Sequence, residues 1–471
     1  MRKLPNPLAR LFATRYLLRP EQASGAVPSS GEAYKAALSM AWPAVAEMMF
    51  VQLIGIVDTV MVSGLGSYAV AAVGLTTQPR MIFLSVFFAL NVGLTAIISR
   101  RKGEGDRAGA NICLAQTLAL TFLFSLLLGA ISYLSSEKLM LLAGAEEDTL
   151  APAAQYFRVI SLGMPISALS MSLSAAQRGV GNTRVALVIN IAANIVNVMA
   201  NYALIGGNLG FPRLEVKGAG IATVIGTGVG LLVALLSLAP RGRFLSFSAF
   251  SRKLADLPTL RAITRIGGSA VAEQVFLRVG FFVFALVVAK LGTFYVAAHH
   301  IAMQLLGLTF TIGDGLGAAA AALVGQNLGK KRADLALLYG KINQRLALSA
   351  SALMFTLIMP LRAVFAGLFT NEPDLIALVS RLLVVMAFIQ PFQTSTVTMG
   401  GSLRGAGDTK YVAFTMLITV AVMRPLTGWL LVYPLGFGLL GAWFAILLDQ
   451  AARMTMLYTR FARARWRNIA I

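Results

Sequence analysis

The sequence predicts an all-α membrane protein in which twelve transmembrane helices form two six-helix lobes related by an internal pseudo-two-fold repeat. Three observations lead to this fold class. Of the 471 residues, 57% are hydrophobic and 13% are charged, whereas soluble domains carry about 25% charged residues. Apolar runs recur at about 20 residues or more, the length that a helix needs to cross a bilayer. The chain also matches itself at a shift of 226 residues.

The internal repeat is seen as matching segments at one constant offset. Ala44–Glu47 (Ala-Val-Ala-Glu) recurs as Ala270–Glu273, and Arg178–Arg184 (Arg-Gly-Val-Gly-Asn-Thr-Arg) corresponds to Arg404–Lys410 (Arg-Gly-Ala-Gly-Asp-Thr-Lys). Because the offset holds over most of each half, the protein consists of two copies of one unit. Many membrane transporters are built in this way, with two similar bundles around a central site.

The expected transmembrane helices follow from the apolar runs, six in each repeat. The sequence lacks the short alternating segments of a transmembrane barrel. Helices are expected at 38–63, 70–99, 110–134, 152–177, 185–206 and 217–239, and again at 264–290, 297–325, 341–368, 373–403, 410–432 and 437–459.

The remaining segments are polar and basic. We expect a cytoplasmic N-terminal arm at 1–37, an N-terminal lobe at 38–239, a cytoplasmic linker at 240–263, a C-terminal lobe at 264–459 and a cytoplasmic tail at 460–471. The net charge of +21 is concentrated in alternate loops. By the positive-inside rule this places both termini in the cytoplasm, and we expect a bacterial inner-membrane protein. The same distribution argues against a nucleic-acid partner.

Several function classes are disfavoured by what the sequence lacks. The single cysteine, Cys113, excludes an internal disulfide and a cysteine-rich metal site. There is no Walker-type phosphate-binding loop, so we do not expect nucleotide hydrolysis. We expect a transporter with no enzymatic activity, no cofactor and no resident metal.

Asp58 is the strongest candidate for a coupling residue, because a carboxylate within a spanning helix is costly and marks a functional site by default. It lies roughly 30 Å along a helix that begins at the inner face, which places it in the outer half. Its counterpart in the second repeat is Phe284, so the charge belongs to one lobe. A carboxylate bathed in water near the helix end is the alternative interpretation.

Three neutral polar residues are expected to join Asp58. Asn197 and Asn201 share one face of the fifth helix near its outer end, and Thr223 lies near the outer start of the sixth. These four residues can meet at one depth and form a site for a coupling proton or, alternatively, a sodium ion. Amides in such helices also hold neighbouring helices together. In the second repeat the two asparagines are replaced by Met423 and Thr427.

Further polar residues are candidates for lining the substrate cavity: Glu47, Glu273, Asp314, Gln52, Arg278 and Gln393. Glu47 and Glu273 are equivalent positions near the inner ends of their helices, where they could attract cations or pair with loop arginines. Asp314 lies inside the eighth helix. It could bind a substrate or a proton, or form a structural ion pair with Arg278 or Arg424.

These motifs resemble the multidrug and toxic compound extrusion (MATE) family over roughly residues 35 to 460. The resemblance rests on Pro43 with Val57-Asp58-Thr59, Leu65-Gly66, Ala297-Ala298-His299, Leu323–Gly329, and the duplicated Arg178–Arg184 and Arg404–Lys410. It implies a V-shaped pair of six-helix lobes that export organic cations and other amphipathic compounds against a proton or sodium gradient.

Within that family the chain is most similar to the DinF-like branch, whose helix-one Asp, helix-five Asn and helix-six Thr correspond to Asp58, Asn197 and Thr223. A second helix-five Asp that is common in that branch is Asn201 here. Sodium favours anionic oxygen ligands, so a single carboxylate suits a proton better. The helix-ten Asp of the NorM-like branch is Gln393 in this sequence.

The resulting hypothesis is a secondary active antiporter in which Asp58 alternates between charged and neutral forms. Its expected partners are cationic or amphipathic drugs and membrane lipids, and a monomer already supplies a complete pathway. The alternative is a lipid-linked oligosaccharide flippase of the same broad superfamily. A channel is less favoured, because pores usually repeat their selective residues in rings.

Overall fold

The computed structural model describes residues 12–18, 20–240, 242–247, 256–467 and 469, and every regular element in these ranges is helical. The remaining parts of the expected arm, linker and tail lie outside the described residues. The first half contains α2 (Thr14–Leu17), α3 (Ser30–Ser63), α4 (Ser67–Glu104), α5 (Arg107–Leu134), α6 (Ser136–Leu142), α7 (Glu147–Leu162), α8 (Met164–Gly179), α9 (Thr183–Gly206) and α10 (Glu215–Leu236). The second half contains α11 (Leu257–Ala289), α12 (Thr293–Gly329), α13 (Ala333–Gly367), α14 (Pro373–Gly405), α15 (Thr409–Met416), α16 (Arg424–Val432) and α17 (Gly438–Ala462).

All twelve expected segments are occupied by helices. Ten described helices are long and apolar enough to cross a membrane, and the bent pair α7 and α8 makes an eleventh span if it is counted as one. The last expected segment, 437–459, is α17. Because α11 begins at Leu257, the helix includes part of the segment that was expected to be a linker.

The fourth expected helix, 152–177, is broken between α7 and α8, which are bent by 53°. Pro165 lies in the first turn of α8, where its ring disfavours continuation of the preceding helix. Gly163 stands at the break, and a β-carbon there would lie 2.3 Å from Cγ2 of Val224 on α10. The equivalent helix α14 contains Pro391 but has Ile389 in place of the glycine, and it runs unbroken.

The eleventh expected helix, 410–432, also departs from a regular α-helix. Between α15 and α16 the backbone forms a π-helical stretch, Leu417–Met423. Pro425 follows after one residue, Arg424, and its missing N–H and bulky ring disturb the hydrogen bonds of the preceding turn. The π-helical stretch is therefore followed by Arg424, whose side chain forms a buried ion pair with Asp449.

Helix boundaries repeat the offset found in the sequence. α12 begins at Thr293, which lies 226 residues after Ser67 at the start of α4, and α13 begins the same distance after α5. Gly66 and Gly292 precede α4 and α12 with φ values of 114° and 104°, a backbone conformation that side chains other than glycine rarely tolerate. The two repeats thus share a turn as well as a helix order.

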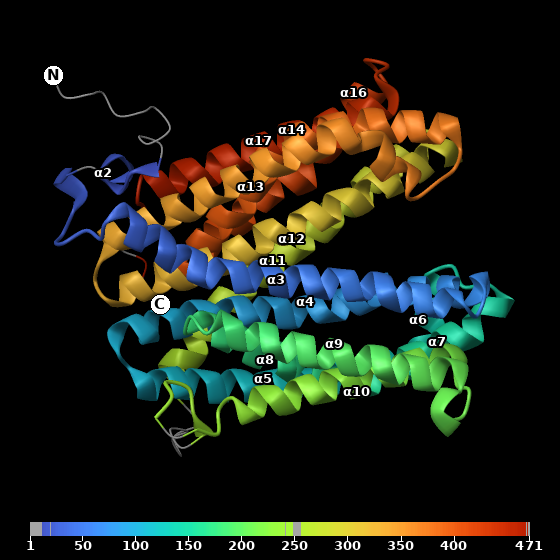
Figure 1. Ribbon diagram of the computed structural model, residues 1–471, viewed down its shortest axis with the longest axis horizontal. Helices are drawn as coiled ribbons and strands as arrows, with labels where there is room; N and C mark the ends of the chain where they lie inside the picture. The colour runs from blue at the N-terminus through green and yellow to red at the C-terminus, as the bar shows by residue number, and fades with distance from the viewer. Residues whose placement is uncertain (1–11, 19, 241, 248–255, 468, 470–471) are drawn as a thin grey trace. The chain divides into compact units, whose positions relative to one another are not determined.

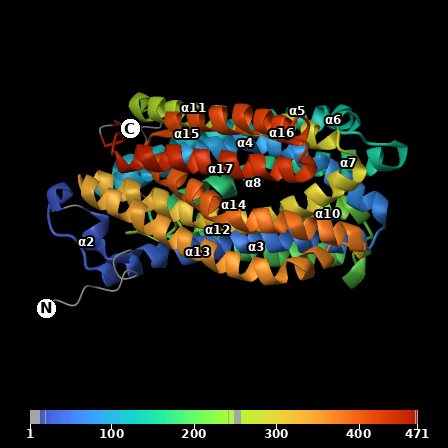
Figure 2. The ribbon, with the colours of Figure 1, turned by 90° about the horizontal axis from the view of Figure 1, so that it is seen from above.

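The chain divides into two compact units. The N-terminal unit is Ala46–Gly267, and the C-terminal unit is the chain up to Val45 together with the chain from Gly268 onward. The boundaries fall inside α3 and α11. In the N-terminal unit α9 packs along α10 and α4 packs against α8, and in the C-terminal unit α12, α13 and α17 pack against α14 (Figure 1; Figure 2).

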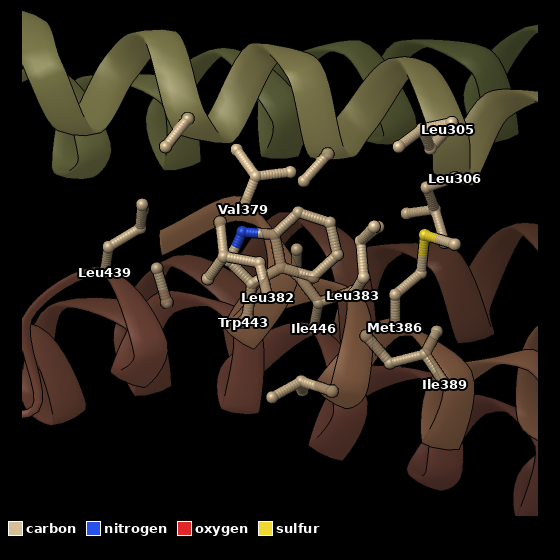
Figure 3. Close-up of a cluster of buried hydrophobic side chains, with 14 of the residues drawn as sticks. Leu305, Leu306, Val379, Leu382, Leu383, Met386, Ile389, Leu439, Trp443 and Ile446 are labelled. Carbon is tan, nitrogen blue, oxygen red and sulfur yellow. The ribbon is translucent and has the colours of Figure 1, made fainter. Parts of the chain in front are cut away.

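The core of the C-terminal unit contains Trp443 of α17, whose side chain is fully buried. Its ring lies among leucines of α14, including Leu382 and Leu383, and faces Leu305 and Leu306 of α12 (Figure 3). Truncation of a buried tryptophan costs about 3–5 kcal/mol. This packing holds α17 in register with α14.

The described part of the N-terminal arm contacts the C-terminal unit. Leu17 and Leu18 are buried in a cluster with residues of α12, α13 and α17. The backbone N–H of Ser24 donates to Oδ2 of Asp334 at 3.0 Å, and Arg332 donates to the carbonyl oxygen of Ala26 at 2.8 Å. The arm is therefore tied to the start of α13 by both apolar and polar contacts.

Candidate functional site

Asp58 on α3 is half-buried and is held by amide groups of α9. The Nδ2 of Asn201 donates to Oδ1 of Asp58 at 2.7 Å. When the Asn197 amide is oriented so that both of its ends are satisfied, its Nδ2 donates to the same carboxylate oxygen at 2.8 Å. The three residues that the sequence expected to share one depth do meet within the N-terminal unit.

Thr223 on α10 completes this group. In its preferred orientation the Asn197 Oδ1 accepts from the backbone N–H of Thr223 at 3.2 Å. The Thr223 hydroxyl donates to the carbonyl oxygen of Ala219 at 2.9 Å, which leaves its lone pairs available as acceptors. We call Asp58, Asn197, Asn201 and Thr223 the N-terminal polar site.

The local sequence explains why α9 and α10 bring these residues together. Asn197 and Asn201 are one turn apart, so both project from one face of α9. A β-carbon at Gly226 would lie 2.5 Å from the carbonyl oxygen of Ala193, so only glycine permits this close approach of α10 to α9. The short distance between the helices places Thr223 against Asn197.

The N-terminal polar site places one carboxylate next to neutral hydrogen-bond donors. The hydrogen-bond partners of the Asp58 carboxylate are neutral amides, and the charge of Arg80 on α4 also acts on it. Asn201 Oδ1 is buried and accepts no hydrogen bond from the described residues. The site therefore offers oxygen atoms to a proton or a cation, and the carboxylate forms no ion pair with the described side chains.

Glu47 is buried near the other end of α3 and is paired. Its Oε1 accepts from Arg178 at 2.6 Å and from Nδ2 of Asn190 at 2.9 Å. The second repeat contains the same pair, in which Arg404 donates to both carboxylate oxygens of Glu273. Both pairs join residues that are 131 positions apart. The sequence left two roles open for these glutamates, attraction of cations and pairing with loop arginines. The contacts match the second role.

Asp314 on α12 pairs with neither arginine that the sequence suggested. Arg424 is bound to Asp449, and no ion pair joins Arg278 to Asp314 in the described part of the chain. The charge of Arg404 acts on Asp314 from a greater distance. Asp314 is half-buried on α12 and forms no ion pair among the described residues.

The other cavity candidates are Gln393, Arg278 and Gln52. Gln393 on α14 is fully buried, and neither end of its amide has a partner among the described residues. Gln52 on α3 and Arg278 on α11 are half-buried. Within the described part of the C-terminal unit, no hydrogen bond links Gln393 to Arg278.

Sequence reasoning missed a buried ionic cluster in the C-terminal unit. Asp449 on α17 binds Arg424 of α16 and Arg453 of its own helix, with Arg453 at 2.7 Å. The signal was present, because Asp449 and Arg453 are one turn apart inside an expected apolar span. We call these three residues the C-terminal triad.

Comparison with known proteins settles the family. The MatE family model matches the chain twice, over residues 43–203 and 270–430. The chain belongs to the MatE family. It is therefore an integral, multi-pass membrane transporter and not an enzyme, as the sequence predicted.

Curated relatives of this MatE protein match over nearly their whole length. The multidrug resistance protein PmpM of Pseudomonas aeruginosa is 29% identical, over 92% of each chain. The uncharacterized transporter YisQ of Bacillus subtilis is 27% identical, over 91% of this chain and 94% of its own. The probable multidrug resistance protein NorM of Thermotoga maritima is 26% identical, over 93% and 94%.

Solved structures support the fold. An outward-facing multidrug resistance MATE family transporter of the MOP superfamily superposes with a TM-score of 0.84 at 21% identity, covering 92% of this chain and 97% of that chain. A MATE protein in the bent conformation gives a TM-score of 0.83 at 23% identity, with 92% and 97% coverage. These similarities confirm the all-helical MATE architecture.

Proposed function

We propose that this transporter exports cationic or amphipathic drugs in exchange for protons, with Asp58 as the proton-binding residue. The observation that carries the proposal is the pairing of one half-buried carboxylate with two neutral amides, at 2.7 and 2.8 Å. The relatives named as multidrug resistance proteins support the substrate class. We further propose the DinF-like branch, a bacterial inner-membrane location with both termini in the cytoplasm, and a monomer as the working unit.

The proposed cycle depends on how the charge of Asp58 changes its hydrogen bonds. Bonds to an ionised acceptor are roughly twice as strong as bonds between neutral groups, so the amides of Asn197 and Asn201 hold α3 most firmly when Asp58 is charged. A proton that arrives from outside weakens both bonds. The outer part of α3 then separates more easily from α9, which favours release of the drug.

Proton return supplies the driving force. Once the protein opens to the inside, Asp58 loses its proton, the amide bonds re-form and a new drug molecule binds. Each charge that moves inward across the membrane contributes about 2.3 kcal/mol per 100 mV. Glu47 and Glu273 are held by arginines, so they are poor candidates for this step.

Protons are preferred to sodium because of the ligand set. Hard cations favour several anionic oxygens, and Asn201 contributes a neutral amide oxygen beside the single carboxylate of Asp58. A proton needs only one carboxylate. The same oxygens would hold sodium weakly.

The test is transport of ethidium by the purified protein in liposomes, with a proton gradient and a sodium gradient imposed separately. We expect movement with the proton gradient and none with the sodium gradient, and we expect Asp58→Asn to lose the response. Equal driving by a sodium gradient would reject proton coupling. Absence of drug movement under either gradient would reject the export of drugs.

A further inference from the structure

The C-terminal triad occupies the position in its repeat that corresponds to the N-terminal polar site. Asp449 lies 226 residues after Thr223, and Arg453 lies the same distance after Thr227. Phe284, the counterpart of Asp58, also lies at this place. The carboxylate is therefore on the first helix in the N-terminal repeat and on the sixth helix in the C-terminal repeat.

The triad is buried and closely bonded. The side chains of Arg424, Asp449 and Arg453 are 4%, 0% and 3% exposed. Arg424 donates from Nε to Oδ2 of Asp449 at 2.8 Å and from a terminal nitrogen to the same oxygen. Arg453 donates to both carboxylate oxygens, at 2.7 and 2.8 Å. Two permanent cations thus surround one anion.

The backbone of the eleventh helix places Arg424 at this point. The π-helical stretch and Pro425 set the direction of the residue between them. A β-carbon at Gly280 of α11 would lie 2.3 Å from the carbonyl oxygen of Val420, so the two helices are in close contact here. The guanidinium carbon of Arg424 then lies 5.0 Å from the ring centre of Phe281 and 5.9 Å from that of Phe284.

Those aromatic contacts complete an environment suited to a cation. Aromatic faces attract a guanidinium group, most strongly when it is removed from water. His299 of α12 packs against Phe284 and Trp443, and the charge of Arg424 acts on it. Arg424 and Arg453 are thus the charged groups that act on Asp449, and Phe281 and Phe284 of α11 contact Arg424.

We propose that the C-terminal triad is a cation site whose occupant is covalently part of the chain: the guanidinium groups of Arg424 and Arg453 take the place that the coupling ion takes in the N-terminal unit. This inference rests on the proposed function, because it uses Asp58 as the ion-binding counterpart. A tethered cation does not leave with the membrane gradient. The C-terminal unit therefore stays in the equivalent of an ion-loaded state, and each transport cycle exchanges one ion through Asp58.

The first test removes the tethered cations and offers free ones. In an Asp58→Asn background, Arg424→Met with Arg453→Met leaves Asp449 as a lone buried carboxylate, and the matched control adds Asp449→Asn. Thermal stability of the purified proteins is measured against pH, with guanidinium or with urea at equal concentration. His299 is present in both proteins, so a difference between them reports Asp449.

We expect the protein that retains Asp449 to lose stability as the pH rises. The neutral carboxylic acid of Asp449 is tolerated in the core, whereas the ionised carboxylate is costly to bury. Guanidinium denatures more strongly than urea at equal concentration, so the effect is read as the melting temperature in guanidinium minus that in urea, compared with the same difference in the control. At high pH this difference should be more positive in the protein that retains Asp449, and the control should show no comparable loss of stability as the pH rises. An equal difference in the two proteins would overturn the assignment of a cation site.

A second test does not require the lone carboxylate to fold. The fully neutral combination Arg424→Met, Arg453→Met and Asp449→Asn is made with Asp58 intact, and the protons exchanged per ethidium are counted in liposomes. We expect the same number as in the wild type. A changed number would show that the triad takes part in coupling and would overturn the inference, whereas loss of proton coupling in the wild type itself would reject only the proposed function.

Discussion

Asn201 on α9 donates a hydrogen bond of 2.7 Å to Asp58 on α3, and these residues are 143 positions apart in the chain. The bond connects α3 to α9, which packs along α10. Its strength depends on the charge of Asp58. In the proposed cycle, helix position and ion binding are therefore linked at this one atom pair.

Replacing Asn201 by Asp should change the preferred ion. A second carboxylate beside Asp58 adds an anionic oxygen ligand of the kind that hard cations favour. We expect Asn201→Asp to gain ethidium transport driven by a sodium gradient, measured in liposomes. Asn201→Leu is the matched control and should gain none. If Asn201→Asp stays indifferent to sodium, the ligand set is not what selects the proton.

The two glutamate–arginine pairs should behave as structural ion pairs. Removal of one partner from a buried pair costs about 3–5 kcal/mol, whereas removal of both costs less. We expect Glu47→Ala to lower the melting temperature more than Glu47→Ala with Arg178→Ala, and the same order for Glu273 and Arg404. Additive losses in both double variants would contradict this reading.

The break between α7 and α8 should require a residue without a side chain. Gly163→Ala places a methyl group against Val224, and overpacking of this kind costs about 1–3 kcal/mol. We expect a lower melting temperature that Val224→Ala partly restores. Gly228→Ala is the control, because a β-carbon at Gly228 meets no atom within 4 Å. An unchanged Gly163→Ala protein would mean that the helices adjust freely at the break.

The contact of the N-terminal arm should depend on Asp334. Its carboxylate binds Arg332 and the backbone of Ser24, so Asp334→Ala removes the polar anchor of the arm. Locally unfolded segments are cleaved first by proteases, and we expect faster trypsin cleavage near Arg15. Asp374→Ala alters an exposed carboxylate elsewhere and should leave cleavage unchanged. Equal cleavage rates would show that the remaining contacts, those of Leu17 and Leu18 and the bond from Arg332 to Ala26, hold the arm without Asp334.

The sequence predicted the helices and the N-terminal polar site because both follow from local rules. Apolar length locates the spans, and counting from a common membrane face places Asp58, Asn197 and Thr223 at one depth. The repeat also identified Phe284 as the counterpart of Asp58. These inferences need only the direction of each helix.

Other features depend on packing that no single segment specifies. The need for glycine at the break depends on the position of Val224, sixty-one positions later in the chain, which leaves no room for a β-carbon at Gly163. Pairing of Glu47 with Arg178 depends on which helix end approaches α3. The sequence does not specify this packing, so it left both cation attraction and arginine pairing open for Glu47. Pairing of Asp449 with Arg424 depends on how α16 packs against α17, which neither segment specifies by itself, whereas the spacing of Asp449 and Arg453 within one span does indicate that pair.

The most direct test of the account counts protons on drug binding. The purified protein is placed in weakly buffered detergent solution, ethidium is added, and proton release is followed in the wild type and in Asp58→Asn. If drug binding and protonation of Asp58 oppose each other, drug binding to the wild type releases protons, with a maximum of one proton per bound drug. The number released rises toward one as the pH is lowered, because a larger fraction of Asp58 is protonated before the drug is added. Asp58→Asn should bind the drug without proton release. Equal release from both proteins would place the coupling proton elsewhere and contradict the account.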